Sequence, residues 1–389
     1  MYIYLFGAGA SAGRNSSYGN VSYINKLIEG QNKAWVKEHE SILQVTPTTF
    51  NISNRLNFLI TRINQLKSQI RIGNNISKLI EIMHDFEWLN NKLSHEPYLD
   101  ILAETEYNTL NKENFFKLTR ITSIFFLLNQ CFFGVDTRYK TLFTTLMSLT
   151  RSGHIPDEVK FFTWNYDYQL EEAMIEKRFH WLHEKKTFEE NIITKRIVRY
   201  NKIWDSPAPE QLTKTLLYKI NGCCATLTNP LNSSNKNIIQ EIIVASNPIY
   251  NNINEINDLN HIAKFINVII EYNDELLSKE KSFNNSISYS WLDDRKQLFR
   301  NIKISIPEKA STLIVFGYSF PTLNSLVDKA FFKGTNIKKI YLQCQEKDKK
   351  TIQSRIEGVA QRKLDIEIID GIDDIHVPFE LQNLLFKKL

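Results

Sequence analysis

Short, continuous apolar runs recur along the chain, and each is followed by a turn. They are rich in β-branched and aromatic residues, and polar or turn-forming residues bound them. Runs of this kind are typical of strands that are buried on both faces of a parallel sheet. The predicted strands cover residues 1–6, 158–164, 216–220, 241–246, 312–317, 339–344 and 366–370.

Between these runs, apolar residues adopt the three- and four-residue spacing of amphipathic helices. Residues 51–147 predict two or three long helices, including one over 111–131. Strands that alternate with helices of this length indicate a parallel sheet covered on both faces. The other predicted helices cover 168–177, 263–278, 323–332 and 347–359.

The pattern as a whole predicts an α/β fold, namely a Rossmann-like, doubly wound and mostly parallel sheet with a helical insertion subdomain. We expect the first strand and the loop after it in residues 1–50, the helical insertion in 51–150, and the remainder of the α/β domain in 151–389. A chain of 389 residues is long enough for two or three domains.

Composition narrows the class of protein further. Charged residues make up 23% of the chain and hydrophobic residues 42%, an ordinary globular balance. The net charge of +5 is small for this length and gives no support for binding to nucleic acid. The apolar start is six residues long, too short for a signal peptide or a membrane span.

The cysteines point to a reducing compartment. Their number and scatter fit neither a disulfide framework nor a zinc site with paired Cys-x-x-Cys ligands. We therefore expect a cytoplasmic protein without a metal. The four residues are Cys131, Cys223, Cys224 and Cys344.

Small residues follow the first predicted strand as Gly7-Ala8-Gly9-Ala10-Ser11. Glycine and alanine let the backbone approach an anion closely, and the helix that comes next offers unpaired N–H groups to a phosphate. The spacing differs from the G-x-G-x-x-G dinucleotide fingerprint. The motif predicts a phosphate-binding loop, and a tight strand-to-helix turn without a ligand is the alternative.

The second predicted strand ends in Thr163-Trp164-Asn165-Tyr166-Asp167. Ligands of open α/β sheets bind at the carboxyl edge of the sheet, where this segment would lie. The amide of Asn165 can donate and accept hydrogen bonds, and the carboxylate of Asp167 can hold a hydroxyl or an amide N–H. Both residue types are also preferred helix N-caps, so capping of the next helix is the competing interpretation.

A third strand end carries Gly317-Tyr318-Ser319-Phe320-Pro321. Gly317 and Ser319 are placed to meet a second part of a dinucleotide, and a plain turn is again the alternative.

The three strand ends, taken in this order, resemble the sirtuin-like NAD-binding family of bacteria. The resemblance is to the branch of antiphage defence effectors that deplete NAD on infection, and it extends over nearly the whole chain. It rests on Gly-Ala-Gly-Ala-Ser, on Thr-x-Asn-Tyr-Asp and on Gly-Tyr-Ser-Phe. The segment His84-Asp85-Phe86-Glu87-Trp88-Leu89 is similar to a short acidic-aromatic helix of that branch.

The resemblance implies an NAD glycohydrolase that releases nicotinamide and ADP-ribose, with NAD as substrate. Residues 7–11 would line the pyrophosphate and adenosine side of NAD. Asn165 and Asp167 would face the nicotinamide ribose and the carboxamide or attacking water, and Gly317 and Ser319 would close on the adenosine half. It also implies abortive infection by an effector that a companion protein, or assembly into a homo-oligomer, activates.

One position departs from the family, in which a histidine acts as a base on the ribose hydroxyl. Asn221 stands at that place, and asparagine cannot take a proton. Loss of a general base typically costs about 10² to 10⁴ in rate. Cleavage could still proceed by positioning and electrostatics, or a histidine from elsewhere could substitute, with His84, His180 and His183 as candidates. In the third interpretation the site only binds nucleotide.

Two further interpretations belong to other classes of protein. A protein deacylase is disfavoured, because deacylating sirtuins carry a zinc module built from two Cys-x-x-Cys pairs, and this sequence has none. The alternative function is a non-catalytic scaffold or sensor that binds NAD or ADP-ribose in a defence complex. A plain interaction protein would bind no nucleotide.

Overall fold

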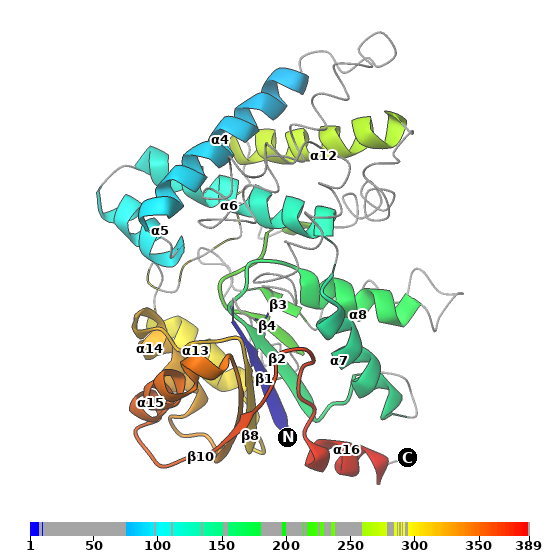
Figure 1. The fold of residues 1–389 in the computed structure, drawn as a ribbon, viewed down its shortest axis with the longest axis vertical. Helices are drawn as coiled ribbons and strands as arrows, with labels where there is room; N and C mark the ends of the chain where they lie inside the picture. The colour runs from blue at the N-terminus through cyan, green and yellow to red at the C-terminus, as the bar shows by residue number, and fades with distance from the viewer. Residues whose placement is uncertain are drawn as a thin grey trace. The chain divides into compact units, whose positions relative to one another are not determined.

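The computed structural model of the chain divides into two compact units (Figure 1). Unit 1 comprises Met1–Arg14, Val135–Cys223 and Ser288–Leu389, and unit 2 comprises Asn15–Gly134 and Cys224–Ile287. Residues 51–134 of the expected helical insertion therefore fall in unit 2. The residues that the structure describes are 1–7, 10, 75–96, 99–109, 112–133, 135–150, 155–179, 197–199, 213, 216–224, 226–228, 235–237, 259–277, 284–285, 287, 289, 291 and 295–387.

A seven-stranded sheet, parallel throughout, forms the centre of unit 1, which confirms the predicted doubly wound α/β fold. Its strand order is β10-β9-β8-β1-β2-β4-β3. The strand predicted at 241–246 lies outside the described residues. The strands are β1 (Tyr2–Phe6), β2 (Val159–Thr163), β3 (Ile197–Arg199), β4 (Leu217–Lys219), β8 (Thr312–Phe316), β9 (Lys339–Gln343) and β10 (Asp365–Ile369).

Helices cover both faces of this sheet because successive side chains of a strand point to opposite sides. Tyr2, Tyr4 and Phe6 belong to one apolar cluster, while Ile3 and Leu5 belong to the other. Figure 1 shows the two helical layers on either side of the strands. The first cluster takes in α7 (Thr137–Ser148), α8 (Gln169–Phe179) and α16 (Phe379–Phe386), and the second takes in α13 (Arg295–Ser305), α14 (Ser325–Asp328) and α15 (Lys349–Ala360).

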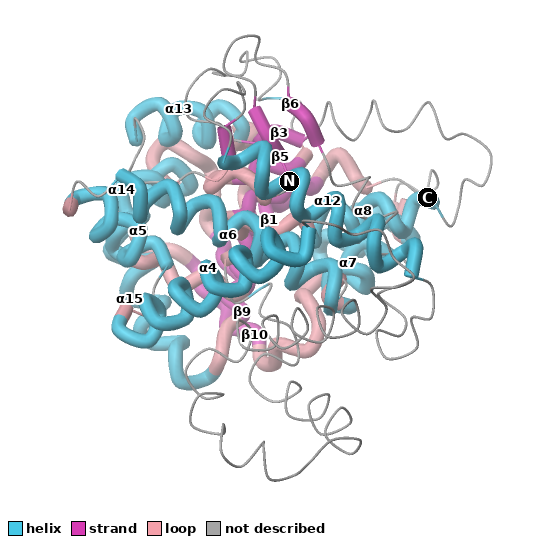
Figure 2. Tube along the Cα trace, turned by 90° about the horizontal axis from the view of Figure 1, so that it is seen from above, coloured by secondary structure: helices cyan, strands magenta, loops and turns pink. Residues whose placement is uncertain are grey.

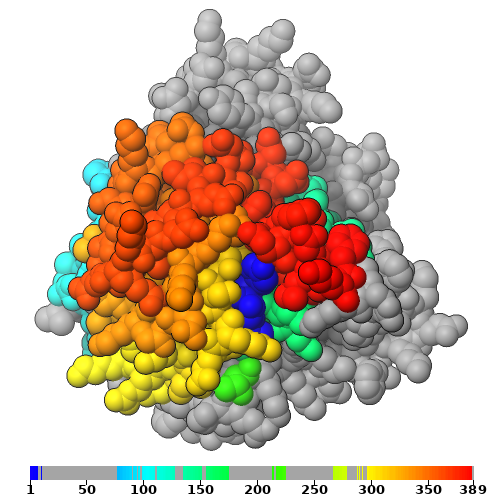
Figure 3. Space-filling model, turned by 90° about the horizontal axis from the view of Figure 1, so that it is seen from below, coloured from blue at the N-terminus to red at the C-terminus, as the bar shows by residue number. Residues whose placement is uncertain are grey.

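The two ends of the chain meet in unit 1. Figure 3 shows the red C-terminal segment beside the blue N-terminal residues. Leu381 and Leu385 of α16 share the apolar cluster of Tyr2 and Tyr4, and the hydroxyl of Tyr4 donates a hydrogen bond to the carbonyl of His376 at 3.2 Å.

Unit 2 is mainly helical in the part that the structure describes. Its helices pack against one another, as Figure 2 shows for α4 and α6. An antiparallel sheet of β5 (Thr226–Thr228), β6 (Asn235–Asn237) and β7 (Asn284–Asn285) accompanies them. The helices are α4 (Asn75–His95), α5 (Leu99–Asn108), α6 (Lys112–Phe133) and α12 (Leu259–Leu277).

Within the described ranges, no helix is both long and apolar enough to cross a membrane. The same ranges hold no group of three or more His, Cys, Asp or Glu residues that could bind a metal ion.

The predicted helix over 323–332 is wrong in its form. That segment consists of a 3₁₀ turn (Thr322–Asn324), one turn of α14 and a second 3₁₀ turn (Lys329–Phe331). Buried side chains on it, Asn324 and Asp328, are hydrogen-bonded to or through Tyr318, and these inward polar contacts accompany the tightened backbone.

β1 and β8 approach each other so closely at their carboxyl ends that residue 7 has no room for a side chain. A Cβ atom on Gly7 would lie 2.6 Å from Cα and Cδ2 of Tyr318 and 2.7 Å from the carbonyl oxygen of Gly317. Two of these three atoms belong to the backbone, so a side chain could not be accommodated by a rotamer change alone.

We predict that Gly7→Ala lowers the free energy of unfolding by about 2 to 3 kcal/mol, because the strand ends must separate to admit the methyl group. Gly358→Ala is the control, since a Cβ at this position of α15 meets nothing within 4 Å. It should stabilise the protein by about 0.5 to 1 kcal/mol through helix propensity. Denaturant unfolding of both variants measures the difference, and equal stabilities would contradict the close approach.

Candidate functional site

The carboxyl ends of four neighbouring strands bring the predicted motifs together at one edge of the sheet. The register aligns Phe6 with Thr163 on one side and with Phe316 on the other, and Thr163 with Lys219. The pairing continues past the strand ends, since Trp164 N–H donates to the carbonyl of Phe6 at 3.0 Å. The residues just beyond these ends therefore form one row, which we call the edge row: Gly7, Trp164, Asn165, Ile220, Asn221 and Gly317.

The edge row lies where the sheet changes direction. The chain passes from β1 to β2 on one side, and it later returns to β8 on the other side of β1. Doubly wound sheets bind their ligands outside the carboxyl ends of the strands at such a switch point.

Tyr318 lies over the switch point. Gly317, in the left-handed region with φ 62°, turns the chain so that Tyr318 contacts Gly7. The ring of Tyr318 stacks on Trp164 with centroids 5.6 Å apart and planes inclined by 12°. The packing of Tyr318 thus requires a glycine at position 7 whether or not a phosphate binds there.

Asp167 caps the helix that follows it, as the competing interpretation of this motif expects. Its Oδ1 accepts a hydrogen bond from the N–H of Gln169, the first residue of α8, at 3.2 Å. Asn165 is buried, and its N–H donates to the hydroxyl of Thr163 at 3.0 Å. The turn that carries both predicted residues is therefore tied to β2 at one end and to α8 at the other.

A buried ionic group supports this turn from within the protein, and sequence reasoning missed it. Nζ of Lys219 donates to the carbonyl of Asp167 and lies 3.3 Å from Oε2 of Glu171. The thiol of Cys223 lies 3.6 Å from the other oxygen of Glu171. The signal in the sequence is a lysine at the end of an apolar strand, where a charge needs partners.

Asn221 occupies the end of the edge row next to Trp164. Its side chain is 3% exposed, and its Nδ2 donates to the carbonyl of Trp164 at 3.1 Å. Gly222, with φ 74°, turns the chain away directly after it. Asn221 is therefore held at the carboxyl edge by a contact to the neighbouring strand end.

The remaining predicted residues do not join the edge row. Ser319 is exposed, and its carbonyl accepts from Nη1 of Arg355 at 3.0 Å. His84 is an exposed residue of α4 in unit 2. Ala10 is buried just beyond the row. Ala8, Gly9, Ser11, His180 and His183 lie outside the described residues.

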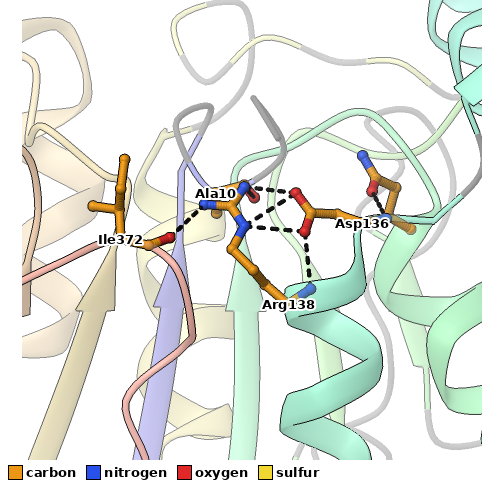
Figure 4. Close-up of polar contacts among 5 residues, drawn as sticks. Ala10, Asp136, Arg138 and Ile372 are labelled. Carbon is orange, nitrogen blue, oxygen red and sulfur yellow. Dashed lines mark hydrogen bonds and ion pairs between the residues drawn. The ribbon is translucent and has the colours of Figure 1, made fainter. Parts of the chain in front are cut away.

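Arg138 clamps the loop after β1 to two other segments (Figure 4). Its side chain is 2% exposed. Its Nη2 donates to the carbonyl of Ala10, and its Nη1 donates to the carbonyl of Ile372, both at 3.0 Å. Nε lies 3.0 and 3.1 Å from the two carboxylate oxygens of Asp136, and Nη2 lies 2.6 Å from Oδ2.

The clamp connects to the predicted catalytic turn. Asp136 N–H donates to the side-chain oxygen of Gln169 at 2.8 Å, and Gln169 in turn donates to Asp167. A chain of hydrogen bonds thus runs from Asp167 through Arg138 to Ala10.

We predict that Arg138→Met destabilises the protein by about 3 to 5 kcal/mol, because it leaves Asp136 as an uncompensated buried charge. The matched control is Lys349→Met, whose ion-pair partners Glu346 and Asp370 are exposed, and its effect should be much smaller. Thermal and urea unfolding report both changes, and similar losses in the two variants would refute the clamp.

Asp328 is the buried acid behind Tyr318. Its two carboxylate oxygens accept from the hydroxyl of Tyr318 at 3.0 and 2.9 Å, and Nδ2 of Asn324 donates to that hydroxyl at 3.1 Å. Burial raises the pKa of Asp328 well above its ordinary value, and the hydrogen bond from Tyr318 opposes part of this shift.

This shift gives a testable pH dependence. Because the folded state has the higher pKa, it binds more protons than the unfolded state, so the contribution of Asp328 is fully present below pH 3.8 and is lost as the pH rises toward the folded-state pKa. We predict that the free energy of unfolding of Asp328→Asn rises relative to wild type as the pH increases from 4 upward. Urea unfolding at a series of pH values measures it; a constant difference would count against the raised pKa.

Comparison with family models, with curated proteins and with solved structures gave no match.

Proposed function

We propose that unit 1 binds NAD along the edge row and cleaves the bond between nicotinamide and ribose, as an NAD glycohydrolase. The observation that carries this proposal is the convergence of three motifs, separated by roughly 150 residues each along the chain, at neighbouring strand ends around the switch point. Ala10, fixed by Arg138, would help to hold the pyrophosphate side of the ligand. Asn165 and Asp167 would face the nicotinamide ribose.

The chemistry assigned to these residues is positioning and electrostatic stabilisation. Departure of nicotinamide leaves an oxocarbenium-like ribose, and the carboxylate of Asp167 would stabilise the developing positive charge or orient the attacking water. The hydrogen bonds of Thr163, Gln169 and Lys219 to the turn would hold Asn165 and Asp167 in place before the reaction.

The second candidate is a non-catalytic sensor of NAD or ADP-ribose. Asn221 favours it, because an amide at this position cannot act as a base. The two candidates share the same site and differ only in whether the glycosidic bond breaks.

The proposal extends to the biological setting that the resemblance implies. The protein would be a cytoplasmic effector of antiphage defence and would deplete NAD in abortive infection. A companion protein, or assembly into a homo-oligomer, would activate it.

The test is incubation of the full-length chain with NAD over a range of protein concentrations, with nicotinamide and ADP-ribose followed by chromatography. We predict release of both products that increases with assembly and falls at least 100-fold in Asn165→Ala, as expected for loss of a group that positions the reacting ribose. Asn383→Ala, an exposed position on α16, is the control and should retain activity.

Other results would decide between the candidates. NAD that stays intact but binds to the wild-type chain and not to Asn165→Ala would establish the sensor. NAD that neither binds nor reacts would refute both candidates.

A further inference from the structure

Asn221 has one half of its amide group satisfied and the other half unmet. Nδ2 donates to the carbonyl of Trp164, whereas Oδ1 is buried and has no hydrogen-bond partner in the described part of the chain. A buried polar atom without a partner costs about 1 to 3 kcal/mol, so it needs an explanation.

The orientation of this amide follows from its neighbour. A backbone carbonyl only accepts hydrogen bonds, so the atom that faces the carbonyl of Trp164 must be the nitrogen. Turning the amide over would place two oxygens against each other. Oδ1 therefore stays directed away from this contact, as an acceptor without a donor.

Trp164 supplies an independent observation at the adjacent strand end. Its indole is 4% exposed, and Nε1 has no hydrogen-bond partner within the described residues. The stacked ring of Tyr318 holds the indole, so this N–H is fixed as well. The edge row thus holds an unmet acceptor and an unmet donor, one residue apart in register past the ends of β4 and β2.

We infer that Oδ1 of Asn221 and Nε1 of Trp164 form a subsite for an uncharged group of the ligand that both donates and accepts hydrogen bonds. This inference rests on the proposed function, because NAD carries two groups of this chemistry, the ribose hydroxyls and the primary amide of nicotinamide. A charged group fits poorly, since Asn221 would repel an anion and neither atom compensates the burial of a cation.

The inference gives Asn221 a role that differs from that of a base. Its oxygen accepts a hydrogen bond from the ligand and takes no proton, so Asn221 acts in binding and orientation. Unmet polar groups in the ligand-free protein then acquire their partners when the ligand enters.

The experiment is isothermal titration calorimetry of the full-length chain with two probes. ADP-ribose carries the hydroxyls without the amide, and nicotinamide carries the amide without the ribose. The variants are Asn221→Leu, which removes both polar atoms at similar volume, and Asn301→Leu, a buried asparagine of α13 as the matched control. Asn221→Ala, which adds no bulk, replaces the first variant if Asn221→Leu does not fold.

We expect Asn221→Leu to weaken binding of one probe by about tenfold and to leave the other unchanged, which identifies the hydroxyl or the amide as the occupant. Asn301→Leu should bind both probes as wild type does. If the wild type binds a probe and Asn221→Leu and Asn221→Ala bind it equally well, the subsite is refuted and the proposed function stands. If the wild type binds neither probe nor NAD, both proposals are refuted together.

Discussion

The architecture of unit 1 depends on the burial of β1 on both faces and its pairing on both sides. Tyr4, Leu5 and Phe6 are completely buried, and the strand is hydrogen-bonded to β2 and to β8 along its full length. An apolar strand with no polar face can satisfy its backbone only in the middle of a sheet. Both helical layers, the direction of the other strands and the position of the edge row follow from this placement.

Polar groups that enter this apolar frame are held by backbone carbonyls as well as by carboxylates. Arg138 binds the carbonyls of Ala10 and Ile372 in addition to Asp136, and Lys219 binds the carbonyl of Asp167 in addition to Glu171. Each cation thereby fixes a loop at the carboxyl edge. The two buried charges serve the same purpose on either side of the switch point, since each links a strand end to a helix.

Apolar runs alone predict the strands and their parallel arrangement, because a fully buried strand has an unmistakable composition. The runs at 312–317, 339–344 and 366–370 match β8, β9 and β10 closely. The short strands β5 and β6 were missed, since Thr226–Thr228 and Asn235–Asn237 contain few apolar residues and lie in a turn-rich stretch. The helix at 323–332 was overestimated, because its spacing does not reveal that Asn324 and Asp328 turn inward to Tyr318.

The candidate site was predictable only in outline. Motif order placed Gly7, Asn165, Asn221 and Gly317 on strand ends, and the parallel sheet brings such ends together. Arg138 and Lys219 left no comparable signal, because their partners are backbone atoms from segments distant in sequence. Contacts of this kind depend on the fold and not on a local pattern.

The position of β1 has a consequence for the order of assembly during synthesis. Tyr2 pairs with Val159 and with Thr312, so the first strand to leave the ribosome acquires its second neighbour only after more than three quarters of the chain is made. At about 5 to 20 residues per second this interval lasts about 15 to 60 s. Throughout it, an apolar strand has an open edge, and the sheet closes only when β8 arrives.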